Sequence, residues 1–467
     1  MYTISGRHLK ERHLMADIHE GTSLQVQGTT EKLMTEGPIL RQLIAFMIPV
    51  MISQLLQQFY LMGDGIVIGR FIGSDALAAQ GTTSLLLSVI GNFFIGMSAG
   101  TSIVIGHLFG HRSFPELKKA ICTSITFCII SGVILTAAGL AGTGLFLEWL
   151  HTPAGISPLA EKYLKISFYG LTFMLVYNVA SAILRALGNS RTPLLILCTT
   201  AGINLVLDLI FICSFSMGIE GAAWATLISQ AASAFFTTAK LMTIDKVYRF
   251  DRLMIDRKNL RDCISKALPS GLQAVFMSIS SLILQTYINS FGPAAMAGMN
   301  CYAKIEGFLY YPLFAFGLAV TTFVSQNDGA GKSDRVKQCL NLSVRLVTIG
   351  SILAILLLLP VSRHLIWIFT DDENVISNGM EAILWTFPLY FLYAVNQVYI
   401  GVIRGVGNVR YPMITSLISY CMFRVIWCAL LIPHFHTMRV VYTSYDISWV
   451  IMLILLMACV RKTAGKK

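Results

Sequence analysis

The chain has 467 residues, of which 55% are hydrophobic and 13% are charged. Soluble globular domains carry roughly twice this share of charged residues, so the composition excludes an ordinary water-soluble fold. The formal net charge of +11 comes mainly from short segments between apolar stretches, which argues against a nucleic-acid-binding surface. Ten cysteines without a C-x-x-C pair or a nearby histidine pattern predict neither a zinc site nor a disulfide framework.

The chain begins with a polar segment, residues 1–37, that has no apolar run. A cleaved signal peptide needs an apolar central region, so this segment is not one. We interpret it as a disordered cytoplasmic tail, and residues 461–467 as a short basic cytoplasmic tail.

Apolar stretches long enough to cross a bilayer recur from Ile39 to Val460. In lipid these stretches must be helices, because every backbone polar group needs a partner inside the segment. We therefore predict an all-α integral membrane protein with twelve transmembrane helices. The first six are expected near 38–70, 76–106, 119–147, 160–185, 191–214 and 219–243. The other six are expected near 264–291, 295–325, 338–369, 379–404, 410–433 and 440–460.

The connections between these helices alternate in charge. The base-rich connections lie near 112–119, 185–191, 246–261, 332–337 and 404–410. The connections between them are poorer in base and carry acidic residues such as Glu148, Glu220 and Asp371. The positive-inside rule therefore places the base-rich connections and both termini in the cytoplasm.

The long charged connection, residues 244–263, divides the chain into an N-lobe at 38–243 and a C-lobe at 264–460. An offset of 219 residues relates the two lobes, and its densest match pairs residues 185–193 with 404–412. Each lobe has an even number of predicted spans, so the two repeats are parallel in the membrane. Repeats of this kind commonly form a cleft between them, which favours a transporter. A channel would more often show oligomeric symmetry, and an enzyme would need a reactive cluster.

Three segments resemble the MATE (multidrug and toxic compound extrusion) family. Residues 178–196, NVASAILRALGNSRTPLLI, are similar to its R-A-L-G-[DN]-[ST]-R-T-P turn. Residues 396–412, NQVYIGVIRGVGNVRYP, resemble the second-half version of that turn, and 317–339 resembles the loop after helix eight. The resemblance extends over about residues 38–460. It implies two parallel six-helix lobes that form a V around a central cavity, within the MOP flippase superfamily.

Carboxylates inside the predicted spans are candidates for function, because ionisable groups in a membrane are costly. They are Asp64, Asp208 and Glu306. Asp208 follows Asn204 by four residues, so both lie on one helix face. The alternatives are that Asp64 merely lies near a helix end and that Asp208 makes a structural interhelical hydrogen bond.

The resemblance implies roles for these residues. The first-lobe cation site of the family falls on Asp64, Asn204, Asp208 and Thr226, and its helix-bending proline falls on Pro49. Burial favours the protonated form of a carboxyl group, and two neighbouring carboxylates share a proton or one cation. The same oxygen atoms also suit sodium, so the coupling ion is H⁺ or Na⁺. No other cofactor and no further metal are expected.

The second lobe differs at these positions. An offset of 219 pairs Asn204 and Asp208 with Phe423 and Trp427, so we expect ion coupling in the first lobe only. This pattern resembles the DinF-like branch of the family. Six residues of the second lobe are candidates for the wall of the central cavity. For each of them the alternative is ordinary helix packing or a structural pair with another side chain. These candidates are Met277, Tyr287, Met299, Tyr302, Glu306 and Arg424.

The resulting hypothesis is an antiporter that exports amphipathic, often cationic, organic compounds in exchange for protons or sodium. It is not an enzyme. We expect small organic substrates and membrane lipid as partners, no nucleic acid, a monomer, and a prokaryotic cell membrane. One alternative is a flippase of the same superfamily for lipid-linked oligosaccharides or peptidoglycan precursors. Another is a membrane receptor or scaffold without transport.

Overall fold

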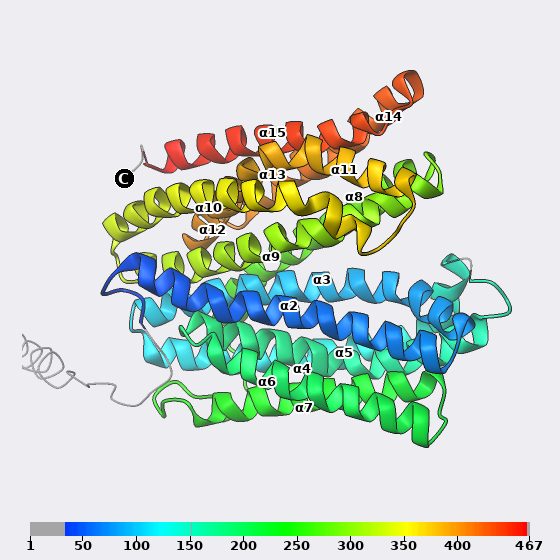
Figure 1. Cartoon of the computed structure of the whole chain (residues 1–467). Helices are drawn as coiled ribbons and strands as arrows, with labels where there is room; N and C mark the ends of the chain where they lie inside the picture. Colours follow the sequence, from blue (N-terminus) through cyan, green and yellow to red (C-terminus); the bar gives the residue numbers. More distant parts are fainter. Residues whose placement is uncertain (1–32, 151, 465–467) are drawn as a thin grey trace, which may run out of the picture.

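Long apolar stretches fold into helices along the whole of the described chain, residues 33–150 and 152–464 of a computed structural model, in which these residues form no strand (Figure 1). Six helical spans make the N-lobe. They are α2 (Ile39–Phe71), α3 (Ser74–Gly110), α4 (Phe114–Trp149), α5 (Ser157–Ala186), α6 (Arg191–Leu209) with the π-helical turn η1 (Ile210–Ser214), and α7 (Ile219–Thr243).

The C-lobe repeats this order, with two of its spans interrupted by short turns of another helix type. Its spans are α8 (Arg257–Asn289), α9 (Pro293–Gly329), α10 (Ser333–Trp367), α11 (Glu373–Thr386) with η2 (Phe387–Leu389) and α12 (Tyr390–Gly405), α13 (Arg410–Ser416) with the π-helical η3 (Leu417–Phe423) and α14 (Arg424–Phe435), and α15 (Arg439–Ala464).

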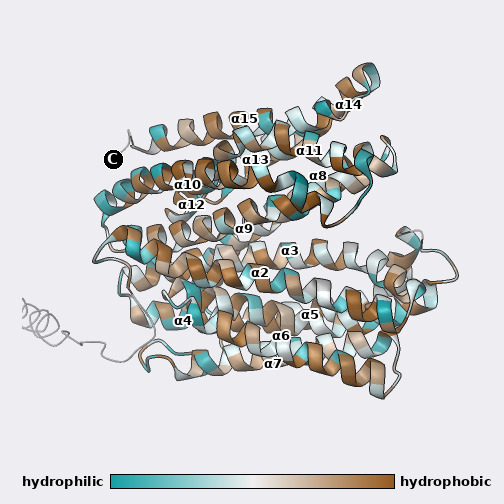
Figure 2. Ribbon diagram, in the orientation of Figure 1, coloured by the Kyte–Doolittle hydropathy of each residue, from teal (hydrophilic) through white to brown (hydrophobic). Residues whose placement is uncertain are grey.

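The expected twelve helices in two six-helix halves are confirmed in the described residues. Eleven of the spans are long and apolar enough to cross a membrane by length and composition. The twelfth, α7, is rich in alanine, serine and threonine, and it packs on α5 and α6. Its small and polar side chains give it a low hydropathy. They are tolerated in a membrane because α7 packs against neighbouring helices. Figure 2 shows hydrophobic residues along the helices and hydrophilic residues mainly near their ends.

Several helices begin earlier than their hydropathy predicts, and the difference is largest for α8. α8 begins at Arg257, seven residues before the expected start at 264, because Asp256 caps it. The carboxylate of Asp256 accepts a hydrogen bond from the backbone N–H of Asn259 at 2.9 Å. That bond holds the pKa of the Asp256 carboxyl below its usual range. The charged first turns of α8 therefore extend the helix beyond its apolar part, and the connection after Thr243 is shorter than expected.

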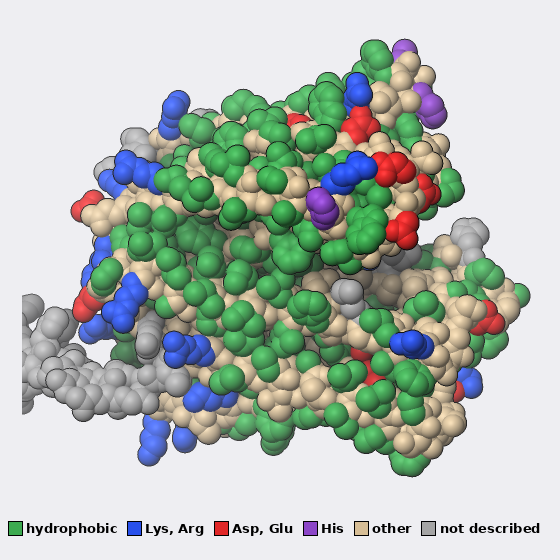
Figure 3. Space-filling view, viewed as in Figure 1, with side chains coloured by type: hydrophobic (Ala, Val, Ile, Leu, Met, Phe, Trp, Pro, Cys, Tyr) green, Lys and Arg blue, Asp and Glu red, His purple; other side chains and the backbone are tan. Residues whose placement is uncertain are grey.

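The two lobes meet mainly along α2, α3, α8 and α9, with α4 also packed on α8, and they diverge toward one end, which gives the V shape visible in Figure 1. α2 and α3 of the N-lobe pack on α9, and α3 also packs closely on α8. Figure 3 shows a hollow between the lobes toward the end where acidic side chains lie, and Lys and Arg side chains gather at the opposite end. Both ends of the described chain lie at this basic end.

Glycines close the V at its basic end. A Cβ atom at Gly100 would collide with the backbone of Ala267, and one at Gly110 with the backbone of Gln326. Gly329 is likewise in contact with the backbone of His107. At the other end of α3, Gly81 has no heavy atom within 4 Å of the corresponding position. The lobes therefore touch backbone to backbone at the basic end and separate toward the acidic end.

α2 belongs to both lobes. Leu43, Phe46 and Val50 in its first half are part of the hydrophobic cluster of the C-lobe. Val67 and Ile68 in its second half are part of the cluster of the N-lobe. The helix thus crosses from one core to the other.

The residues just before α2 are packed against the C-lobe, which corrects the predicted disordered tail for residues 33–37. The backbone N–H of Met34 donates to Gln326 Oε1 at 2.7 Å, and Lys332 donates to the carbonyl oxygen of Thr35 at 3.0 Å. Gln326 also donates to the carbonyl oxygen of Ala186 in the N-lobe at 2.7 Å. Met34 and Thr35 are buried, and Gln326 and Lys332 supply hydrogen-bond partners for their backbone. The rest of the predicted tail, residues 1–32, lies outside the described residues.

The glycine contacts predict that Gly110→Val destabilises the protein while Gly81→Val, in the same helix, does not. A side chain at position 110 must displace the backbone of α9, and overpacking of this kind costs about 1–3 kcal/mol. Thermal unfolding of both variants in detergent tests this, with a lower apparent melting temperature expected for Gly110→Val alone. Equal melting temperatures would show that the lobes do not meet at Gly110.

Candidate functional site

Three helices of the N-lobe bring four predicted residues together. α2 supplies Asp64, α6 supplies Asn204 and Asp208, and α7 supplies Thr226. Asn204 and Asp208 are each 1% exposed and Asp64 is 7% exposed, although all three side chains are polar. The predicted residues therefore form one buried polar cluster in an apolar lobe.

The amide of Asn204 lies between the two carboxyl groups. With its nitrogen turned toward them, it donates to Asp64 Oδ1 at 3.0 Å and to Asp208 Oδ2 at 3.1 Å. Its oxygen then accepts from the backbone N–H of Thr226 at 3.3 Å. This orientation satisfies all three neighbours, so Asn204 joins α2, α6 and α7 through one side chain.

One carboxyl oxygen of the cluster remains available to a ligand. Asp208 Oδ1 is buried, and it has no hydrogen-bond partner in the described part of the chain. Two carboxylates this close cannot both stay charged in a low-dielectric interior without a proton or a cation between them. Carboxylate, amide and hydroxyl oxygens are suitable ligands for a hard cation. The donor set therefore fits either a proton or sodium.

Local sequence explains how the cluster forms. The spacing of four residues puts Asn204 and Asp208 on one face of α6, and the π-helical turn η1 begins two residues after Asp208. Such turns are frequent at functional sites, because they change the direction of a helix face. Pro49 lies inside α2, which continues through it as one helix, and Ser53 donates to the Pro49 carbonyl oxygen at 2.8 Å. That Pro49 bends α2 stays a prediction.

A residue that the sequence analysis missed completes the cluster. The hydroxyl of Tyr60 donates to Thr226 Oγ1 at 3.4 Å. Tyr60 precedes Asp64 by four residues and so lies on the same face of α2. The spacing of four residues from Asp64 could have identified Tyr60 from the sequence.

The second lobe has a different set of residues at the corresponding place. α6 and α13 begin 219 residues apart, at Arg191 and Arg410, but α7 and α15 begin 220 apart, at Ile219 and Arg439. The π-helical η3 accommodates the additional residue, because a π-helix has a wider turn. After η3 the counterparts of Asn204 and Asp208 are therefore Arg424 and Cys428. The expected counterparts Phe423 and Trp427 are wrong by one residue.

Arg424 is held by an aromatic cage and a hydroxyl group. It is 9% exposed, and its Nε donates to Ser448 Oγ at 2.8 Å. Its guanidinium lies 4.1 Å from the ring centre of Tyr445 and 4.9 Å from that of Tyr420. The same offset of 220 makes Asp446 the counterpart of Thr226, and Asp446 is 8% exposed. Asp446 lies in the predicted span 440–460, where the sequence analysis overlooked it.

The remaining candidates lie in the C-lobe, in different surroundings. Met277, Tyr287 and Met299 are half-buried against the C-lobe cluster. Tyr302 is 1% exposed and packs on Phe387, so the structure places it in the core rather than on a cavity wall. Glu306 is half-buried and accepts a hydrogen bond from the hydroxyl of Tyr390 at 3.0 Å.

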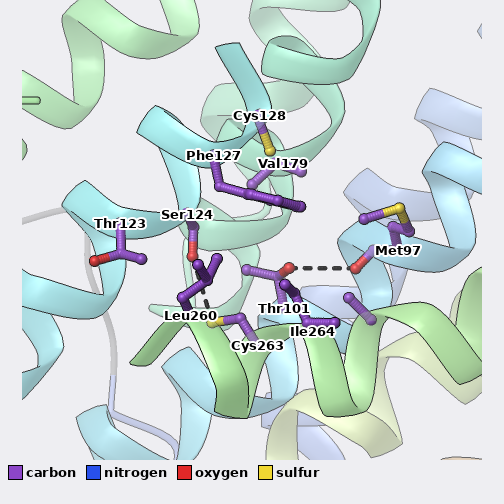
Figure 4. Close-up of a pocket in the computed structure, with 11 residues that line it drawn as sticks. Met97, Thr101, Thr123, Ser124, Phe127, Cys128, Val179, Leu260, Cys263 and Ile264 are labelled. Carbon is purple, nitrogen blue, oxygen red and sulfur yellow. Dashed lines mark hydrogen bonds between the residues drawn. The ribbon is translucent and has the colours of Figure 1, made fainter. Parts of the chain in front are cut away.

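A small pocket near the basic end of the V has no charged residue in its lining. It lies between α3, α4, α5 and α8 (Figure 4). Ser124 Oγ and Cys263 Sγ lie 3.5 Å apart in its wall, and Thr101 donates to the carbonyl oxygen of Met97 at 3.2 Å. Without a charged group it offers no binding site for an ion, so the Asn204 cluster is the stronger candidate.

Comparisons with known proteins match both lobes to one family. A sequence profile of the MatE family matches residues 49–210 and 269–430, one match in each lobe. The probable multidrug resistance protein YpnP of Bacillus subtilis (strain 168) is 29% identical over 397 residues, which cover 85% of this chain and 89% of the relative. The multidrug export protein MepA of Staphylococcus aureus (strain MW2) is 21% identical over 423 residues, covering 90% and 91%.

Solved structures share the fold. One shows the outward-facing conformation of a multidrug resistance MATE family transporter of the MOP superfamily, with a TM-score of 0.85, 21% identity, and coverage of 93% of this chain and 98% of that one. A MOP superfamily transporter from Pyrococcus furiosus Vc1 (DSM3638) has a TM-score of 0.86 at 21% identity, covering 95% and 100%. The profile matches cover more than half of the chain, so this protein belongs to the MATE family of membrane transporters and is not an enzyme.

Proposed function

We propose that this protein is a secondary active antiporter that exports amphipathic, often cationic, organic compounds in exchange for protons or sodium. The observation that carries the proposal is the pair of buried carboxyl groups, Asp64 and Asp208, bridged by Asn204. The named bacterial relatives are multidrug resistance and export proteins, which supports organic compounds as substrates.

The coupling ion binds at Asp64 and Asp208 and removes their mutual repulsion. Asp64 lies on α2, whose other half is packed into the C-lobe. A change in the packing of α2 at Asp64 is therefore transmitted to the interface between the lobes. Pro49 is fifteen residues away, or about 22 Å along the helix axis, and it removes one backbone hydrogen bond from α2. It is the place where α2 changes its shape most easily.

The basic end of the V faces the cytoplasm, with both termini, and the hollow opens to the outside. The gathering of Lys and Arg at one end supports this orientation (Figure 3). The protein works as a monomer in a prokaryotic cell membrane.

A lipid-linked precursor flippase fits the C-lobe less well, because its substrate would need exposed basic groups in the cavity for a pyrophosphate. Arg424 is enclosed by Tyr420, Tyr445 and Ser448. Lys304 lies over the ring of Phe369, with its nitrogen 4.4 Å from the ring centre.

Asp64→Asn is expected to abolish gradient-driven export and leave the protein folded. The change keeps the shape of the side chain and removes the charge that holds the ion. The measurement is export of a cationic dye from vesicles with an imposed pH gradient or an imposed sodium gradient, one at a time. Asp75→Asn, at an exposed carboxylate in the first turn of α3, is the control and should export normally. Normal driven export by Asp64→Asn would remove the proposed coupling role.

Raising the concentration of the coupling ion should weaken substrate binding in the wild type. Coupling between two ligands is reciprocal, and its usual size is about 5- to 150-fold in affinity. Asp64→Asn should bind the dye but lose this dependence, because a ligand shifts an equilibrium only through different affinity for its two states. Equilibrium dye binding to purified protein at several ion concentrations measures both effects. An unchanged ion dependence in the variant would place the ion elsewhere.

A further inference from the structure

The connection between the two lobes, residues 244–256, is a strap that lies along α4. Its aromatic residue Tyr248 is buried, and the ring is stacked on Phe114 in the first turn of α4, with ring centres 5.6 Å apart. One turn further along α4, Lys118 forms an ion pair with Asp251 at 2.5 Å. The strap is therefore packed on the N-lobe from its beginning.

Threonine hydroxyl groups of α4 hold the second half of the strap. The backbone N–H of Asp256 donates to Thr123 Oγ1, and that of Met254 donates to Thr126 Oγ1, both at 3.0 Å. Thr126 lies twelve residues after Phe114, so the strap follows α4 for about 18 Å at 1.5 Å per residue.

This distance brings the strap to the surface of the membrane. α4 has 36 residues, which correspond to about 54 Å, whereas the hydrocarbon core of a bilayer is about 30 Å thick. About 12 Å of the helix thus extend beyond the core at each end. The first turn of α4 lies at the basic end of the V, so the part of the strap beside Thr126 lies where lipid headgroups meet acyl chains.

Two apolar side chains of the strap point away from the protein at this level. Exposure alternates along the strap, as it does in an extended chain. Met254 is half-buried against the hydrophobic cluster of the N-lobe. Its neighbours Leu253 and Ile255 are 63% and 46% exposed. A pair of exposed apolar side chains at the depth of the headgroups is suited to contact with lipid.

Basic side chains surround this apolar pair. They come from the strap and from the first two turns of α8, they are all exposed, and none of them forms an ion pair within the described part of the chain. These side chains are Arg252, Arg257, Lys258 and Arg261.

Most carboxylates of the same segment are bound within the protein. Asp245 accepts a hydrogen bond from the backbone N–H of Val247 at 3.0 Å, Asp251 pairs with Lys118, and Asp256 caps α8. Asp262 is exposed. The outer surface of the strap and of the start of α8 therefore keeps an excess of positive charge beside its apolar pair.

We propose that the strap and the first two turns of α8 form a docking surface for anionic phospholipids. Leu253 and Ile255 contact the upper part of the acyl chains, and Arg252, Lys258 and Arg261 bind the phosphate groups. Charge complementarity favours a lipid as the occupant, because basic groups next to a membrane attract anionic headgroups and apolar side chains hold the chains below them. The inference concerns the membrane and not the transported compound, so it does not depend on the proposed function.

The lipid would act on the connection between the lobes. The strap leads from α7 of the N-lobe to α8 of the C-lobe, and its own hydrogen bonds and ion pair go to α4 of the N-lobe. A headgroup that contacts Arg252 and Lys258 at once joins the strap to the start of α8. Anionic lipid should therefore slow local opening of the strap.

The test is hydrogen–deuterium exchange of the purified full-length protein in nanodiscs, in which phosphatidylglycerol replaces phosphatidylcholine stepwise. Amide exchange of residues 251–256 should slow as the phosphatidylglycerol content rises, because bound lipid opposes local opening. Arg252→Gln/Lys258→Gln should raise the content needed for half-maximal slowing by about five-fold for each charge removed. Lys337→Gln/Arg410→Gln is the matched control, because it removes two exposed charges from the C-lobe at the same end of the V and should leave that content unchanged.

Two further arms separate a lipid from other occupants. Leu253→Asn/Ile255→Asn should also reduce the slowing, and soluble glycerol phosphate added to phosphatidylcholine nanodiscs should cause none. Slowing by glycerol phosphate would assign the surface to a soluble phosphate ester, and slowing only in nanodiscs with two copies would assign it to a second copy of the chain. Either result would overturn the lipid assignment.

The wild type alone can decide against the proposal. Strap exchange that does not change with phosphatidylglycerol overturns it, whether or not the variants purify in folded form. Equal shifts in the two charge variants would also overturn it, because they would show a diffuse attraction of lipid to the whole basic end.

Discussion

The amide of Asn204 between two buried carboxyl groups is the interaction on which the N-lobe depends. Two acidic side chains in an apolar helix bundle are unfavourable unless polar groups replace the water that they lose. Asn204 supplies two donors to them and receives the backbone N–H of Thr226. One side chain therefore holds α2, α6 and α7 at a fixed separation. It also leaves Asp208 Oδ1 without a partner among the described residues, and this is the atom that a proton or cation would stabilise.

The C-lobe has a positively charged side chain at the place corresponding to Asn204. Arg424 stands where the N-lobe has Asn204, and the position of Asp208 is taken by Cys428, which is buried. The cation of Arg424 is stabilised by Tyr445, Tyr420 and Ser448, so it needs no exchangeable partner. Two lobes of the same fold thus differ in whether their central charge can be taken up and released. The C-lobe also has a buried carboxyl oxygen without a hydrogen-bond partner among the described residues, Asp446 Oδ1, so the lobes differ in the fixed positive charge of Arg424 and not in the presence of an acidic group.

The number of helices and the residues of the N-lobe cluster could be predicted from the sequence. A membrane-spanning helix is recognised by the length of its apolar stretch, which does not require knowledge of how the helices pack. The twelve helices and the cluster of Asp64, Asn204, Asp208 and Thr226 follow from apolar length, helical spacing and the family resemblance. The early start of α8 was not predicted, since it depends on the capping by Asp256. Neither was the register of Arg424, since one extra residue in η3 is visible only once its hydrogen bonds are known. The burial of Met34 depends on partners in α9 that lie about 290 residues away.

The path between the two lobes runs through α2. Leu43, Phe46 and Val50 anchor its first half in the C-lobe core, while Val67 and Ile68 anchor the second half in the N-lobe core beside Asp64. The basic end of the V is fixed by backbone contacts at glycines, so movement there requires the lobes to separate as bodies. A change at Asp64 can therefore be absorbed locally only within α2, and Pro49 lies where the helix leaves the C-lobe core. Because α2 also packs on α9, a change in its packing reaches a central helix of the C-lobe. Under the proposed function, the ion bound at Asp64 therefore changes the contact between the lobes through one shared helix.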